Sequence, residues 1–182
     1  MSAVTTLPYS GPYTRDDLEL MPDDGHRYEL LDGTLLVSPA PRPLHQRVVG
    51  NLHVLLRTGC PAELEVLFAP LDVVLAHDTV LEPDLLIAPR DQFTARDLQG
   101  PPLLAVEVLS PSTRRIDLLL KRDRLEEAGC PSYWLVDPDE PSLTALELVD
   151  GRYAEVARVE GEQAWAAQRP YPVTVVPADL LR

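Results

Sequence analysis

The sequence is short of cysteine, aromatic residues and long apolar runs, and each shortage excludes a class of protein. Two cysteines, Cys60 and Cys130, are too few for a disulfide framework or a four-ligand zinc site, so we expect free thiols and a cytoplasmic location. No apolar run approaches the roughly 18 residues that a membrane span needs. The first 11 residues lack the basic patch and apolar stretch of a secretory signal. Aromatic residues make up only 5%, which predicts a core built mainly from Leu, Val and Ala.

The chain also has few basic residues, 16 against 29 acidic ones, and its net charge is −13. This balance argues against a protein that holds nucleic acid by bulk electrostatics, because neutralising phosphates requires clustered Lys and Arg. A small basic site, or a site that recruits divalent cations, remains compatible with it. Lys121 is the only lysine, and every other residue in the Lys and Arg total is Arg. Because an ammonium is a compact charge and a guanidinium a wide planar fork, the single lysine draws attention to its surroundings.

The length and composition predict one globular domain. A chain of 182 residues with 45% hydrophobic and 25% charged residues can bury a substantial core. The 19 prolines against 9 glycines favour stiff loops and no flexible linker. We expect a flexible N-terminus over residues 1–12 and a single domain over residues 13–182.

The order of the predicted elements indicates an α+β fold. Two Asp-Gly pairs, Asp32-Gly33 and Asp150-Gly151, each lie between β-capable runs and predict hairpins. Amphipathic spacing predicts one helix over residues 44–57, and a second is expected over 114–128, capped by residues 110–113 (SPST). Further strands are predicted within residues 64–75, 82–87, 103–109, 133–136 and 172–176. We therefore expect a central mixed sheet flanked by two principal helices, with additional hairpins.

Glu107 interrupts an otherwise apolar strand. Six of the seven residues from 103 to 109 are apolar, and a carboxylate in such a strand costs several kcal/mol unless it is paired or bound to a metal. Strand alternation places Glu107 on the face shared with Leu103, Ala105 and Leu109. Two interpretations remain open: a structural ion pair with a buried arginine, or a ligand at the end of a strand, where open sheets place their sites.

Asp84 and Lys121 are the other candidates. Asp84 follows Pro83 at the start of its own apolar strand, and two carboxylates on neighbouring strands suit Mg²⁺ or Mn²⁺. The alternative for Asp84 is an ordinary strand-entry aspartate. Lys121 lies in the second helix with Asp117 and Arg124 on one face, either as an exposed i,i+4 pair with Asp117 or turned toward Glu107. The apolar face of that helix is predicted to carry Ile116, Leu119 and Leu120.

These residues, together with a set of ordered motifs, resemble the PD-(D/E)XK nuclease superfamily. More closely, the chain resembles the Uma-type restriction endonuclease family, formerly a domain of unknown function. The matching stretches, in the order the family shows, are residues 27–33 (RYELLDG), 38–41 (SPAP) with His45-Gln46, 69–73 (APLDV), 83–85 (PDL), 106–113 (VEVLSPST), 117–122 and 133–138 (YWLVDP).

The resemblance implies a restriction-endonuclease-like fold and a set of roles. Asp84 and Glu107 would bind a divalent cation, Mg²⁺ or Mn²⁺, with help from the backbone carbonyl of Val108. Lys121 would replace the lysine that the superfamily usually carries two residues after the glutamate, where Leu109 stands here. Glu29 would be an additional acidic residue of the site. His45 and Gln46 match a pair that lies near it.

The implied activity is metal-dependent hydrolysis of DNA phosphodiester bonds. Arg114, Arg115 and Arg122 form a small basic stripe beside the expected site and would contact nucleic acid, unless they are only a solvated helix face. A homodimer follows on symmetry grounds if both strands are cut. Two alternatives remain: a nuclease-like fold with weak or absent catalysis whose acidic surface binds a protein partner, and a metal-dependent phosphohydrolase that acts on a substrate other than DNA.

Overall fold

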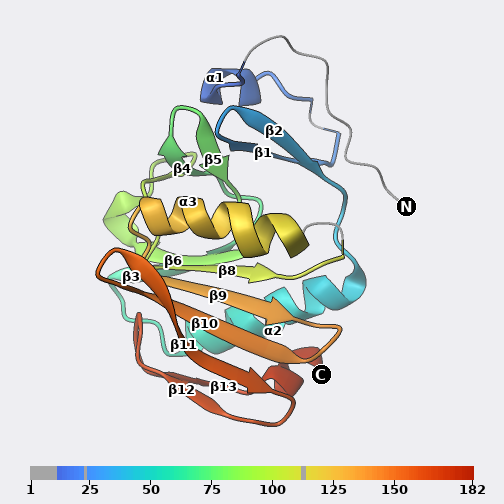
Figure 1. Ribbon diagram of the computed structural model, residues 1–182, viewed down its shortest axis with the longest axis vertical. Helices are drawn as coiled ribbons and strands as arrows, with labels where there is room; N and C mark the ends of the chain where they lie inside the picture. Colours follow the sequence, from blue (N-terminus) through green and yellow to red (C-terminus); the bar gives the residue numbers. More distant parts are fainter. Residues whose placement is uncertain (1–11, 23, 112–113) are drawn as a thin grey trace.

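The computed structural model describes residues 12–22, 24–111 and 114–182 (Figure 1). Residues 1–11 of the predicted flexible N-terminus and residues 112–113 of the predicted cap lie outside this range. No helix within the described ranges is long and apolar enough to cross a membrane.

A six-stranded mixed sheet forms the centre of the molecule, as predicted. Its strand order is β11-β10-β9-β8-β6-β3, in which β8 and β9 run parallel and the other neighbours antiparallel. The strands are β3 (Leu64–Phe68), β6 (Leu85–Pro89), β8 (Leu104–Val108), β9 (Ser132–Asp137), β10 (Ser142–Val149) and β11 (Arg152–Glu160). The Asp150-Gly151 hairpin joins β10 to β11.

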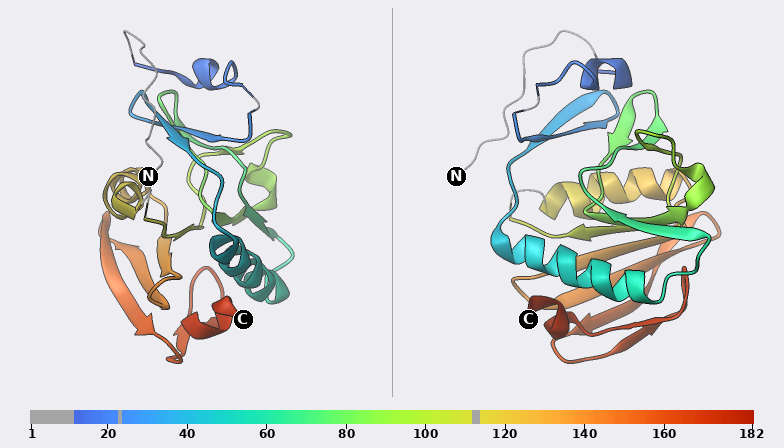
Figure 2. Two further views of the ribbon diagram at one scale, coloured as in Figure 1. Left: turned by 90° about the vertical axis from the view of Figure 1, so that its right-hand side faces the viewer. Right: turned by 180° about the vertical axis from the view of Figure 1, so that it is seen from behind.

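The two principal helices cover opposite faces of this sheet (Figure 2). On one face lies α2 (Pro43–Thr58), which begins with a proline and buries Val48, Leu52 and Leu56 at helical spacing. On the other face, a six-residue π-helix, η2 (Ile116–Lys121), continues into α3 (Arg122–Glu127). Strand β8 serves both layers: its even-numbered residues pack toward α2, whereas Ala105 and the following Leu109 pack toward α3.

A second, five-stranded sheet stands above α3 in Figure 1. Its order is β2-β1-β5-β4-β7, from β1 (Arg27–Leu31), β2 (Thr34–Ser38), β4 (Val73–Ala76), β5 (Thr79–Leu81) and β7 (Leu98–Gln99). The sequence predicted the β1–β2 hairpin, but it did not predict that this hairpin belongs to a separate sheet. The remaining elements are α1 (Arg15–Leu18), η1 (Arg90–Gln92), β12 (Trp165–Ala167), β13 (Val173–Val175) and η3 (Pro177–Leu181). The link from β5 to β6 joins the two sheets and carries residues 82–84.

Both Asp-Gly turns have positive φ at both residues, but only the first is tightly packed. A Cβ on Gly33 would lie 2.6 Å from Cβ of Pro12, whereas a Cβ on Gly151 meets nothing within 4 Å. Gly33→Ala is therefore expected to lower the free energy of unfolding by about 2 kcal/mol or more, and Gly151→Ala by only about 1 kcal/mol. Urea denaturation of both variants measures the difference. If both variants lost the same free energy of unfolding, Pro12 would be able to move away from the added Cβ without a measurable cost.

Candidate active site

Lys121 lies at the centre of a buried ionic cluster between the two sheets. Its Nζ is 2.8 Å from Oε1 of Glu29 on β1, 3.0 Å from Oε1 of Glu107 on β8, and 3.5 Å from Oδ1 of Asp117 on η2. Each of these side chains is only 1–2% exposed. The ammonium therefore joins a strand of each sheet to the helix packed against them.

Asp84 extends the cluster on the other side of Glu107. Its Oδ2 accepts a 2.8 Å hydrogen bond from the backbone N–H of Val108 and lies 3.0 Å from Nε2 of His45, while its Oδ1 accepts one of 2.8 Å from Nη1 of Arg27. The Nε of Arg27 is also 3.6 Å from Oε2 of Glu29. Arg27 is thus a second cation shared by carboxylates of both sheets.

The register of the central sheet makes Asp84 and Glu107 neighbours. The antiparallel pairing of β6 and β8 sets Leu85 opposite Val106, so the next step along both strands brings Asp84 opposite Glu107. Among the described residues, Oε2 of Glu107 is buried without a hydrogen-bond partner. A buried, unsatisfied carboxylate oxygen is costly, which identifies this atom as one that can accept a ligand.

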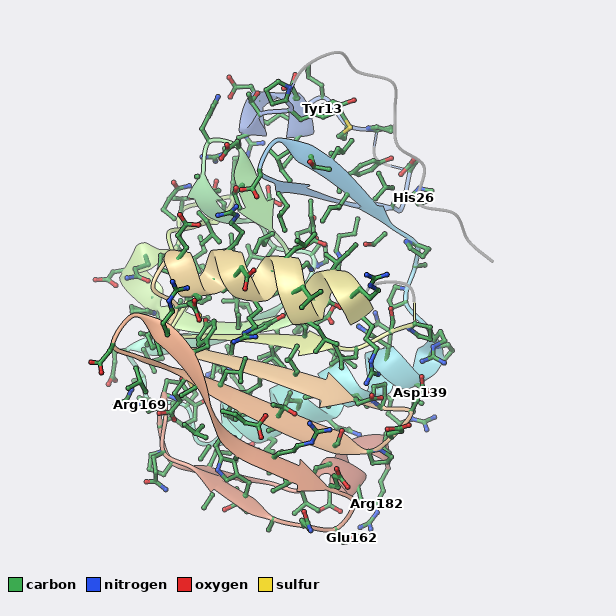
Figure 3. All side chains as sticks on the ribbon, viewed as in Figure 1. Tyr13, His26, Asp139, Glu162, Arg169 and Arg182 are labelled. Atoms are coloured by element: carbon green, nitrogen blue, oxygen red, sulfur yellow. The ribbon has the colours of Figure 1, made fainter. Side chains whose placement is uncertain are left out.

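A cavity of about 690 Å³ opens onto Asp84. Arg27, His45 and Gln46 line it, and much of its remaining wall is formed by residues 38–42, with Ala69-Pro70 and Ser110-Pro111. Glu107 and Lys121 are not part of the wall, so Asp84 and Arg27 stand between them and the cavity. His26, another wall residue, and Asp139, which pairs with Arg42 at 2.8 Å, lie on the same side of the molecule in Figure 3.

Burial and charge shift the pKa values of the cluster in different directions. Burial raises the pKa of Glu107 well above its usual value; Lys121 opposes this rise, and Asp117 and Asp84 add to it. Burial alone would also raise the pKa of Asp84, but the hydrogen bond with His45 and the charge of Arg27 outweigh it, so the pKa lies well below its usual value. The two neighbouring carboxyls are therefore inequivalent, a pattern typical of functional sites.

Burial and neighbouring charges also act in opposite directions on the pKa of Lys121. Burial would lower the pKa of its ammonium, but the charges of Glu107, Glu29 and Asp117 outweigh burial and raise it. Lys121 is therefore a fixed positive charge.

The cluster contains more negative than positive groups. Four carboxylates, those of Glu29, Asp84, Glu107 and Asp117, share the two cations Lys121 and Arg27. In the part of the chain that the structure describes, no three His, Cys, Asp or Glu side chains are grouped as ready metal ligands. The arrangement instead offers two adjacent carboxyl groups, Asp84 and Glu107, in a cluster where acidic side chains outnumber the cations.

The structure brings together most of the residues singled out from the sequence. Glu29, Asp84, Glu107, Lys121 and Val108 meet as described, and His45 contacts Asp84. Gln46 is exposed and lines the cavity. The basic stripe lies elsewhere: Arg114 pairs with Asp137, Arg115 is exposed, and Arg122 lines a different hollow.

The predicted apolar face of the second helix was wrong. Leu119 and Leu120 are 53% and 47% exposed, whereas Asp117 and Lys121 are buried, so Lys121 is turned toward Glu107 rather than forming an exposed pair with Asp117. Charge explains the reversal, because the carboxylates of Glu29 and Glu107 lie behind this helix and an apolar face could not pair with them. Leu103 also departs from the prediction: it precedes β8 and packs with the cluster on the α2 side.

Sequence reasoning missed Arg27, Asp117 and Glu82 as members of the site region. Arg27 and Glu29 are two residues apart in a strand and therefore share a face, which is a signal that alternation alone could have given. Glu82 lines the cavity, and burial, with Glu29 adding to it, raises its pKa to about 7. Its backbone N–H donates a 2.8 Å hydrogen bond to Oε1 of Glu29. Nothing in the local sequence distinguishes Glu82 from an ordinary loop residue.

Two comparisons with known proteins give a match, one with a family model and one with a solved structure. Residues 15–178 match the model of the Uma2 family, described as "Putative restriction endonuclease". The fold is similar to the crystal structure of a protein from Anabaena variabilis ATCC 29413, titled a putative nuclease belonging to DUF820. That similarity has a TM-score of 0.70 at 17% sequence identity and covers 93% of this chain and 98% of that one. No curated protein matches this chain. The match over residues 15–178 shows that the chain belongs to the Uma2 family.

Proposed function

We propose that this protein is a metal-dependent nuclease that hydrolyses phosphodiester bonds of DNA at the Asp84–Glu107 site. The observation that carries the proposal is the pairing of two inequivalent carboxylates across β6 and β8, with a buried ammonium on one and a cavity opening onto the other. A structural ion pair would need neither the cavity nor the unsatisfied oxygen of Glu107.

The residues present fit a divalent cation. Mg²⁺ and Mn²⁺ are held in proteins by one or two carboxylates, with water or substrate oxygens completing the shell. Asp84 and Glu107 supply those carboxylates, and Oε2 of Glu107, which has no hydrogen-bond partner in the described part of the chain, is available. Because the N–H and C=O of a strand residue point to the same edge, the bond from the Val108 N–H to Asp84 puts the Val108 carbonyl on that edge as well. The excess of acidic side chains over cations in the cluster favours a cation further.

The side chains around the cation site have separable tasks. A divalent cation bound there would polarise the scissile phosphate and ease deprotonation of a water molecule. Lys121 donates a hydrogen bond to Oε1 of Glu107 and so holds that carboxyl group in place, and its positive charge acts on the site from behind the cavity wall. His45, on α2, and the Val108 N–H, on β8, orient Asp84. Arg27, on the cavity wall, is placed to contact a phosphate oxygen of the substrate.

An interaction module with no catalysis is the second candidate, favoured by the net charge of −13. A partner protein would then bind the acidic surface, and the buried cluster would only stabilise the fold. The two candidates differ in what happens when a carboxylate is neutralised without changing its shape.

Replacing Asp84 by asparagine is expected to lower plasmid nicking in Mn²⁺ or Mg²⁺ by more than about 100-fold, because a cation ligand is lost. The matched control is Asp97→Asn, since Asp97 is an equally buried aspartate that pairs with Arg15 outside the cluster. Agarose-gel nicking assays with and without chelator, alongside calorimetric Mn²⁺ titration, give the readouts. Wild-type protein that neither binds Mn²⁺ nor nicks DNA would favour the interaction module.

A further inference from the structure

A second hollow, of about 370 Å³, lies on the face of the central sheet that carries α3. It is bounded by η2 and α3 on one side and by β9, β10 and β11 on the other, all of which face the viewer in Figure 1. Its apolar floor comprises Leu109, Leu118, Leu135 and Leu146, with Tyr153 beside them. We refer to it as the arginine groove, because Arg114, Arg122 and Arg158 stand on its rim.

Arg122 carries a guanidinium nitrogen without an acceptor. Its Nε is buried, and within residues 12–22, 24–111 and 114–182 this atom finds no hydrogen-bond partner. The other rim arginines are only partly engaged: Arg114 pairs with Asp137, and the Nε of Arg158 is 3.8 Å from Glu160 at the exposed edge. A buried guanidinium nitrogen without an acceptor is costly unless a ligand supplies one.

The chemistry of the groove suits a phosphate attached to an apolar group. A guanidinium presents a planar fork of donors that matches phosphate oxygens, and the hydroxyls of Ser142 and Thr144 on the same wall can donate as well. The leucine floor can accept the face of a sugar or base. Three arginines stand against two acidic residues, Asp137 and Glu155, in the wall of the groove, which is a high share of basic residues for a chain of net charge −13.

The groove and the cavity at Asp84 adjoin the same stretch of chain. Leu109 and Asp137, at the ends of β8 and β9, line the groove, whereas Ser110 and Pro111, the next residues after Leu109, line the cavity. A chain of nucleotides that has one phosphate at Asp84 can therefore pass over this stretch and reach the groove.

We propose that the arginine groove binds a backbone phosphate of the substrate strand, beyond the phosphate that is cut, with Arg122 as the principal contact. This inference rests on the proposed nuclease function and specifies how the substrate strand leaves the site. It also locates positive charge that the overall composition does not suggest.

Metal-free binding of a fluorescent single-stranded oligonucleotide, measured by anisotropy over a range of salt concentrations in chelator, tests the groove separately from catalysis. Arg122→Gln is expected to weaken binding by at least about 5-fold and to reduce the salt slope by about 1. The matched control is Arg152→Gln, which removes an equal charge from β11 outside the groove and should change the affinity less than about 2-fold. Removing a groove acid with Glu155→Gln should tighten binding.

Three results would overturn the inference: equal losses in Arg122→Gln and Arg152→Gln, an unchanged salt slope in Arg122→Gln, or no oligonucleotide binding by the wild type. Asp84→Asn separates the two proposals, because it should abolish nicking and leave the Arg122-dependent binding in place. One result would support the nuclease proposal and contradict the groove proposal. In that result nicking depends on Asp84, but Arg122→Gln and Arg152→Gln bind the oligonucleotide equally well.

Discussion

Lys121→Met is expected to lower the free energy of unfolding by about 3–5 kcal/mol in metal-free buffer. The substitution keeps an unbranched side chain of similar length, so it changes the charge more than the packing. It leaves Glu29, Glu107 and Asp117 buried without the ammonium that lies 2.8, 3.0 and 3.5 Å from them. Urea denaturation followed by circular dichroism measures the loss.

The control for this effect is Arg124→Met, three residues further along the same helix. Arg124 pairs with Asp32 at the surface, where removal of an ion pair typically costs less than about 1 kcal/mol. If the two variants lost equal stability, Lys121 would not be the cation that holds the cluster together.

Divalent cations should partly rescue Lys121→Met if Asp84 and Glu107 bind them. A ligand that binds only the folded state stabilises it in proportion to the logarithm of its concentration, and a cluster that has lost a cation has more negative charge to offer. Millimolar Mn²⁺ is therefore expected to raise the melting temperature of Lys121→Met by more than that of the wild type. The same small shift in both proteins would contradict a cation site beside Lys121.

The sequence revealed the parts of the site whose local context is unusual. Glu107 is conspicuous because its neighbours in β8 are apolar, and Lys121 because it is the only lysine. The surroundings of Arg27 and Asp117 are less unusual, although alternation puts Arg27 on the face of Glu29, and their burial results from the second sheet and the helix meeting over the central sheet. That meeting joins residues nearly 100 positions apart, and no local pattern encodes it. Leu119 and Leu120 show the converse, because hydropathy alone would bury them and the ionic cluster instead turns them outward.

The elements of the fold that have a local sequence signature were also predictable, whereas the long-range pairings were not. The Asp-Gly hairpins, the α2 helix and the apolar β8 strand each have a local signature, and all were predicted. The division of the strands into two sheets was not, because β1 joins β5 through a single pair, Leu30 with Val80, some 50 residues apart. Pairings of that range follow from packing rather than from sequence pattern.

Glu107→Gln is expected to change stability and activity in opposite directions. Burial and the neighbouring carboxylates Asp84 and Asp117 make the charged form of Glu107 unfavourable, so a neutral side chain of the same shape removes that cost. Lys121 keeps Glu29 and Asp117 as partners, and the amide oxygen at position 107 can still accept its hydrogen bond. In metal-free buffer the free energy of unfolding should stay the same or rise by about 0.5–2 kcal/mol, while nicking falls by more than about 100-fold.

Glu126→Gln provides the opposite case. Glu126 is a mostly buried carboxylate that accepts hydrogen bonds from the Tyr153 backbone N–H and from Arg152, and it lies outside the ionic cluster. Its neutralisation should cost about 1 kcal/mol and leave nicking intact. The two variants are therefore expected to differ in opposite ways: Glu107→Gln loses nicking but not stability, and Glu126→Gln loses stability but not nicking. If Glu107→Gln instead lost several kcal/mol, like a broken structural ion pair, the carboxylate would be there for the fold. If the folded protein is more stable without the charge of Glu107, then that charge serves to bind a cation rather than to hold the fold together.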